Sequence, residues 1–427
     1  MALTYDLTLS HPRPRPLRAP ATSVAVRSEE DICDAVMQAR LTGTTVRAVG
    51  ARGSKNACYR TEGAALHLGR YDRVLAIDGC SITVEAGITC GQLNDILWRY
   101  GLFLPTQGEW QGATIAGALA TGVHGGALGH GILPSSVRSL RLISGNGVPI
   151  DIQRGTDLFA NVAVSLGLFG VTSTVRLDCV PACYLELVSE VIPIEAYLRN
   201  LATFAAGNEF FSAVWIPSAR QVITWAANPA SAPDRIVPRR QRYSIATTVA
   251  NLVSQRLTKG EVPRRWFEGR AVDAAHRIVT PIGEGSRVMR GVRLLTRHWR
   301  EAEFAVPFAR AGEAITRLEA LVARYPDALT VPVGLRATAR DGFSLSPCRD
   351  RDTFWLAVFY RDRNGFGDEL SDLFQDLEAR NHWGKHPNLP GDYLRRQYPA
   401  WEQVAAARRR LDPAGVFSND FSRRFAP

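Results

Sequence analysis

The sequence predicts an α+β fold whose first domain, made of short strands and helices, ends near Pro181. An amphipathic helix at residues 28–40 leads into a strand at 45–49, an alternation typical of a mixed domain. A glycine-rich stretch at 104–131 interrupts this alternation, and beyond residue 183 the expected strands and helices become longer. With 427 residues and a hydrophobic share of 46%, the chain can fill the cores of two or three domains.

Local signals justify the elements of the first domain. Ser28 caps the first helix, with Asp31 as its capping-box partner. The turn at 50–54 lacks the spacing and the Gly-Lys pair of a P-loop, which excludes an ATPase. Asn146 and Gly147 predict a hairpin turn. Further strands are expected at 66–68, 73–77, 82–85, 137–144, 149–152 and 171–177, and a second helix at 89–100.

The glycine-rich stretch at 104–131 is the most informative part of the chain. It holds eight glycines and three threonines, and no Asp, Glu, Lys or Arg occurs from Trp110 to Val137. Glycine lets bare backbone N–H groups approach an anion closely, so the two phosphates of a dinucleotide are the expected ligand. A solvated surface loop is the alternative, but such a loop is normally richer in Ser, Pro, Lys and Glu.

The net charge of +10 is concentrated at residues 235–300, where fifteen basic residues face four acidic ones. This region could meet nucleic acid, an anionic membrane surface or an acidic carrier, or it is a solvated arginine-rich surface. No aromatic stacking platform supports nucleic acid. A helix expected at 244–257 fits core packing as well as a membrane surface. Seven dispersed cysteines, with no signal peptide and no long apolar run, indicate a cytoplasmic protein, and no cluster has metal-ligand spacing.

Six segments in a fixed order carry a family resemblance: 49–56, 114–125, 165–172, 345–347, 382–385 and 411–415. Together they resemble the vanillyl-alcohol-oxidase, or PCMH-type, FAD-binding flavoproteins, and more narrowly the aldonolactone and alditol oxidases. The resemblance implies a two-subdomain FAD-binding domain and a cap domain built on an antiparallel sheet, with a C-terminal segment that returns to close the flavin site. The implied bounds are 15–182, 183–378 with the basic insertion 235–300, and 379–427.

The resemblance also implies which residues bind FAD. Two glycine segments would hold the cofactor through their backbones, and Gly170 and Val171 would add to them. His382 and Lys385 would reach the flavin from the cap side, where Lys385 favours the anionic reduced ring. A surface lysine is the alternative, although only three of the 51 basic residues are lysines. The two glycine segments contribute Val49, Gly50, Ala51, Arg52, Gly53 and Ser54, and Gly108, Glu109, Thr114, Gly117, Thr121, Gly122, Val123 and His124.

Several positions depart from the family pattern. Gly53 stands where many relatives carry a histidine bonded to the flavin, so we predict noncovalent FAD. The glutamate-x-arginine pair of polyol and lactone oxidases is reduced to Arg336, because Gly334 replaces the glutamate. Trp355 and Phe359 lie on a strand that is polar in alditol oxidases, so we expect them to line an apolar substrate pocket.

Glu109 falls where the sugar oxidases have a small hydroxyl residue beside the flavin. A carboxylate buried there could take a proton from a substrate hydroxyl or amine. Pairing with one of the many arginines is the alternative. Gly108 is small enough to leave O2 a path to the flavin.

These observations predict an FAD-dependent oxidase with Glu109, Arg336 and Lys385 as catalytic residues. It would remove hydride from a C–H bond next to an OH or NH group of a non-sugar or modified-sugar biosynthetic intermediate, and O2 would become H2O2. One alternative is an FAD dehydrogenase with another electron acceptor, acting on a lipid-linked or anionic substrate. Another is a membrane-surface or nucleic-acid binding protein whose flavin fold is vestigial.

Overall fold

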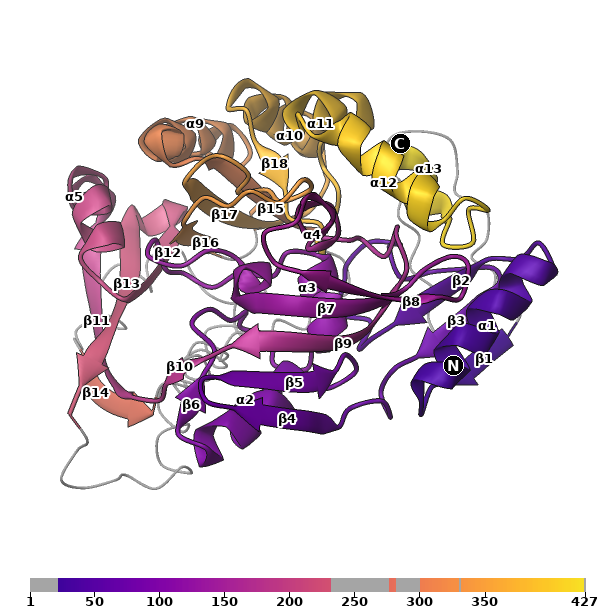
Figure 1. The fold of residues 1–427 in the computed structure, drawn as a ribbon. Helices are drawn as coiled ribbons and strands as arrows, with labels where there is room; N and C mark the ends of the chain where they lie inside the picture. Colours follow the sequence, from indigo (N-terminus) through magenta and orange to yellow (C-terminus); the bar gives the residue numbers. More distant parts are fainter. Residues whose placement is uncertain (1–21, 232–275, 282–299, 330–331, 426–427) are drawn as a thin grey trace, which may run out of the picture.

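A computed structural model describes residues 22–231, 276–281, 300–329 and 332–425. These residues form a mixed α+β molecule with a parallel and an antiparallel sheet in the N-terminal half and a large antiparallel sheet beyond them (Figure 1). The predicted α+β class and the antiparallel cap sheet are therefore confirmed. The domain bounds 15–182, 183–378 and 379–427 stay a prediction.

The N-terminal half holds a three-stranded parallel sheet, ordered β1-β3-β2, and a five-stranded antiparallel sheet, ordered β4-β5-β9-β7-β8. Its strands are β1 (Thr22–Ala25), β2 (Val46–Val49), β3 (Ala64–His67), β4 (Val74–Asp78), β5 (Ser81–Glu85), β7 (Val137–Ile143), β8 (Pro149–Gln153) and β9 (Val171–Asp178). Its helices are α1 (Glu29–Leu41), α2 (Cys90–Arg99), α3 (Ile115–Ala120) and α4 (Asp157–Val162).

The expected start of the first helix and the expected hairpin are confirmed. Ser28 accepts a hydrogen bond from the Asp31 backbone, and the Asp31 carboxylate accepts one from the Ser28 backbone. The turn at 144–148 joins the antiparallel pair β7 and β8, and Gly147 adopts a left-handed φ of 70° there.

The cap sheet has eight strands in the order β14-β11-β13-β12-β16-β17-β15-β18. Helices α5 and α9 pack against it (Figure 1). Its elements are β11 (Tyr184–Pro193), α5 (Ile194–Ala206), β12 (Phe210–Ile216), β13 (Gln221–Ala230), β14 (His276–Pro281), β15 (Arg300–Pro307), α9 (Ala311–Arg324), β16 (Val333–Thr338), β17 (Thr353–Tyr360), α10 (Phe366–Asp376) and β18 (Arg380–Asn381). The short strands β6 (Leu102–Phe103) and β10 (Val180–Pro181) pair at the junction with the N-terminal half.

The chain beyond the cap runs back to the N-terminal sheets as α11 (Gly391–Gln397), α12 (Trp401–Leu411) and α13 (Asp420–Phe425), the yellow helices of Figure 1. Val416 accepts a hydrogen bond from the Val46 backbone. The Asn419 amide donates to the carbonyls of Cys58 and Arg60. The last segment is thus built into the N-terminal half.

One buried arginine joins three distant parts of the chain. Arg47, on β2, is 3% exposed and donates to the carbonyls of Cys58, Leu166, Gly167 and Phe417. Burial lowers the pKa of Arg47 to about 10. Because the guanidinium has donors in a rigid fork, one side chain can satisfy all four carbonyls.

Most of the basic region 235–300, including the helix expected at 244–257, lies outside the described residues. Within the described part of the chain, every helix is too short or too polar to cross a membrane. All seven cysteines are described and unpaired.

Candidate active site

The two glycine segments predicted to bind FAD lie against each other. A Cβ atom on Gly50 would come within 2.2 Å of the Thr114 Oγ1 atom, so only glycine permits this approach. Thr114 caps α3, where its Oγ1 atom accepts a hydrogen bond from the Gly117 backbone. Residues 50–54 and 114–124, which are far apart in sequence, therefore form one surface.

The first glycine loop offers bare backbone donors, as a diphosphate requires. Ala51, Arg52 and Gly53 are exposed, and among the described residues no acceptor faces their backbone N–H groups. The segment 382–385 closes the other side: Gly384 accepts from the Lys55 backbone at 2.8 Å, and the Asn56 amide donates to the Lys385 carbonyl at 2.9 Å. These features fit a dinucleotide held by main-chain groups.

The other predicted cofactor residues surround this surface. Thr121, at the end of α3, donates its hydroxyl to the Gly117 carbonyl, and Gly122 has a left-handed φ of 64°. Gly170 lies against β7, where a Cβ atom would come within 2.4 Å of the Ile143 carbonyl oxygen. Val49 ends β2 and is buried, and Ser54 and Val171 complete the set.

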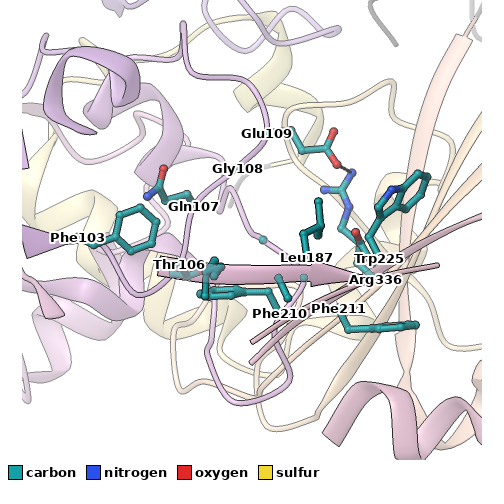
Figure 2. A pocket seen from close by; sticks show the side chains of 15 residues that line it. Phe103, Thr106, Gln107, Gly108, Glu109, Leu187, Phe210, Phe211, Trp225 and Arg336 are labelled. Carbon is teal, nitrogen blue, oxygen red and sulfur yellow. Dashed lines mark ion pairs between the residues drawn. The ribbon is translucent and has the colours of Figure 1, made fainter. Parts of the chain in front are cut away.

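A pocket that is partly open to solvent separates the second glycine segment from the cap sheet (Figure 2). Glu109 and Arg336 lie on its wall and form an ion pair, with 2.7 Å between Oε1 and Nη2. The rest of the wall is mostly apolar. The apolar side chains are Phe103, Leu185, Leu187, Phe210, Phe211, Trp225 and Ala227.

The structure thus brings the predicted catalytic residues Glu109 and Arg336 together. Glu109, however, is less buried than the sequence analysis expected. The Glu109 side chain is 43% exposed, whereas that of Arg336 is 18% exposed. Burial lowers the pKa of Arg336, but Glu109 and two further glutamates outweigh it, so the pKa is raised. Gly108 also lines the pocket, yet the space beside it is filled, because a Cβ atom there would lie 2.3 Å from Val123 Cγ1.

Lys385 follows β18 and contacts two glutamates of β15. Its ammonium group pairs with Glu301 and lies 3.9 Å from Glu303. Burial lowers the pKa of Lys385, but the two carboxylates outweigh it and raise the pKa overall. Lys55 contacts Glu301 from the opposite side at 3.8 Å, so two of the three lysines of the chain face one carboxylate.

Glu303 is a buried carboxylate that the sequence analysis missed. It is 4% exposed and lies 3.3 Å from His124 Nε2. Burial raises its pKa, but His124 and Lys385 hold the pKa well below the usual range. His382 lies nearby, and burial lowers its pKa to about 3, so this ring stays neutral. Glu301 and Glu303, at alternate positions of a strand that is apolar from Phe304 onwards, were the signal for this cluster.

The structure places Trp355 and Phe359 outside the pocket expected for them. Trp355 is fully buried behind His124, with the two rings stacked 3.7 Å apart, and its indole N–H donates to Thr338. Phe359 stands opposite Glu301 on β17 and is not among the pocket residues. The apolar character was anticipated, but β11, β12 and β13 supply it. Apolar residues spread over these three strands, together with Phe103 on β6, give no single motif in the sequence.

His124, Glu303 and His382 have ligand atoms within 4.8 Å of one another, which is metal-ligand geometry. Each already has a protein partner. His124 faces Glu303 and the Gly125 carbonyl, and His382 Nδ1 accepts from the Gly384 backbone at 2.9 Å. We therefore interpret the trio as a structural cluster in which Glu303 faces His124 and His382 stays neutral.

Comparison with known proteins agrees with this geometry. The D-arabinono-1,4-lactone oxidase family matches residues 175–425, and the FAD binding domain family matches residues 20–153. The chain belongs to the D-arabinono-1,4-lactone oxidase family. It is an FAD-dependent oxidoreductase of the PCMH-type fold, as the resemblance predicted.

Two relatives illustrate the range of this family. The chain is 30% identical to L-gulono-1,4-lactone dehydrogenase of Mycobacterium tuberculosis, over 95% of this chain and 96% of the relative. It is 27% identical to L-gulonolactone oxidase of Bos taurus, over 92% of each chain. The solved cholesterol oxidase of Brevibacterium sterolicum shares the fold, with a TM-score of 0.73, 16% identity and coverage of 95% and 94%.

Proposed function

We propose that this protein is an FAD-dependent oxidase that takes hydride from a C–H bond next to an OH or NH group of a substrate with an apolar body. The observation that carries the proposal is the Glu109–Arg336 ion pair, which is the only pair of charged residues among the described residues of a mostly apolar pocket wall. Bound FAD supplies the hydride acceptor. A modified sugar or a non-sugar intermediate fits this pocket better than a free polyol, because most of the wall is apolar and offers few partners for a row of hydroxyls.

The ion pair suggests how the lost glutamate at position 334 is replaced. Gly334 and Arg336 lie on the same face of β16, because alternate residues of a strand share a face. Glu109 reaches the same guanidinium from the opposite wall, so the carboxylate now comes from the glycine segment. In this role Arg336 binds a carbonyl or anionic group of the substrate, and Glu109 accepts the proton of the reacting OH or NH group.

Lys385 has a separate role in the proposal. Held by Glu301 and close to Glu303, its ammonium group has a fixed position and stays charged. Placed beside the flavin, this charge would stabilise negative charge on the reduced ring. Noncovalent binding of FAD is part of the proposal, because Gly53 has no side chain to bond.

A dehydrogenase that passes electrons to another acceptor is the second candidate. The Val123 side chain, which fills the space beside Gly108, favours it, and one relative is named a dehydrogenase. Anaerobic reduction followed by exposure to air separates the two candidates. Rapid reoxidation with H2O2 release supports the oxidase, and slow reoxidation supports the dehydrogenase.

The substrate is tested by measuring flavin reduction with two sets of compounds. One set contains L-gulono-1,4-lactone and free alditols, and the other contains secondary alcohols and amines with an aromatic or alicyclic body. We expect the second set to reduce the flavin faster. Fast reduction by a free lactone or alditol alone would refute an apolar substrate.

Glu109→Gln tests the proton acceptor. We expect a loss of about 100-fold or more in the rate of flavin reduction, the usual contribution of a general base. Glu209→Gln is the matched control, because Glu209 is an exposed carboxylate paired with His130 outside the pocket wall. A near-normal rate of flavin reduction in Glu109→Gln would show that Glu109 is not the proton acceptor and serves only to pair with Arg336.

A further inference from the structure

Trp110 lies directly over Gly53, the position at which the family resemblance places a flavin-linked histidine. A Cβ atom on Gly53 would come within 1.7 Å of the Trp110 Cζ3 atom. On Gly112 it would come within 3.0 Å of Trp110 Nε1. The indole therefore rests on glycines from both cofactor segments, which have no side chains to push it away.

The indole is also unusually open to solvent for so large an apolar group. Trp110 is 47% exposed, although its neighbours on the same segment, Gln111 and Thr114, are buried. An exposed indole fixed between two ligand-binding loops is available to a flat, apolar ligand. The residues next to it, Glu109 and Gly108, line the substrate pocket, so the indole stands where the cofactor and pocket surfaces meet.

We propose that Trp110 is a cofactor clamp that retains FAD by ring contact, in the place where relatives use a covalent bond. The indole offers a large, rigid face at a small cost in conformational entropy, and aromatic contacts of this kind strengthen binding measurably. Gly53 and Trp110 form a matched pair in this proposal: Gly53 has lost the linking side chain, and its bare backbone makes room for the indole.

The experiment measures FAD binding rather than turnover, so its result does not depend on the proposed reaction. FAD is removed from the holoenzyme, and the rebinding of FAD is followed by the quenching of flavin fluorescence. We expect Trp110→Ala to raise Kd by about tenfold, equivalent to about 1.4 kcal/mol. Trp110→Phe keeps an aromatic face and should raise Kd by no more than about threefold.

Two further variants make the test specific. Trp98→Ala is the matched control, because Trp98 is an exposed indole on α2, where its ring lies 6.0 Å from that of Tyr184; its Kd should not change. Gly53→Ala is a steric probe, because its backbone is not left-handed and the three atoms nearest the new methyl group all belong to the indole. It should raise Kd in the wild-type background and have no further effect in Trp110→Ala.

An unchanged Kd in Trp110→Ala would overturn the proposal, and a lower Kd would show that the indole obstructs the cofactor. Equal effects of Gly53→Ala in the two backgrounds would also overturn it. If Trp110→Ala fails to fold, as judged by thermal unfolding of the apoprotein, the Kd values of Trp110→Phe and Gly53→Ala test the proposal instead. A Gly53→Ala variant with wild-type Kd then counts against the clamp.

Discussion

Replacing Glu303 by Gln should strongly destabilise the apoprotein while leaving the shape of the side chain unchanged. Glu303 Oε2 lies 3.9 Å from Lys385 Nζ. At an effective dielectric constant of about 20, unit charges at this separation attract by about 4 kcal/mol. Removing one member of a buried pair costs about 3–5 kcal/mol. Glutamine keeps an acceptor for His124, and Lys385 keeps Glu301, so we expect a loss of about 3 kcal/mol.

The assay is urea unfolding of the apoprotein at pH 7 and at pH 4. The folded pKa of Glu303 lies well below the usual value, so its stabilising contribution is complete above the unfolded pKa and is lost as the pH falls through the folded pKa. The difference between wild type and Glu303→Gln should therefore shrink in acid. Glu313→Gln is the control, because its partner Arg310 is 2.9 Å away on the surface and the effect should be far smaller. Equal effects of the two substitutions would refute a buried ion-pair cluster.

Two further predictions concern residues outside the pocket. Arg47→Lys should lower the free energy of unfolding by about 3 kcal/mol, because one ammonium group cannot satisfy four buried carbonyls. Urea unfolding measures this, and an unchanged midpoint would show that water replaces the guanidinium. Asp341 is half-buried, and burial raises its pKa to about 6. Wild type should therefore lose stability as the pH rises from 4 to 7, by about 3 kcal/mol relative to Asp341→Asn, whereas parallel pH profiles would contradict the raised pKa.

Much of the fold could be predicted because its signals are local. The capping box at Ser28 and the turn at Gly147 depend on a few adjacent residues, and both are confirmed. The glycine segments were recognisable because a cluster of glycines can be read directly from the sequence. The contact between Gly50 and Thr114 then explains why the first of these glycines is required.

The pocket was harder to predict because its wall is assembled from separate strands. Trp355 had the right chemical character, but the register of β17 turns it behind His124. Phe210 and Trp225 lie on β12 and β13, whose pairing brings them to one wall. Pairing of Glu109 with one of the many arginines was one of two open interpretations, and only the spatial arrangement identifies that arginine as Arg336.

The buried guanidinium group of Arg47 has a consequence for the folding of this protein during translation. It ties β2 to the Phe417 carbonyl, 370 residues further along the chain, and Asn419 likewise holds the loop that follows the first glycine turn. A nascent chain therefore emerges from the ribosome with the first half of its nucleotide cradle unsupported. The contacts that hold the first glycine loop are complete only after translation has passed Asn419.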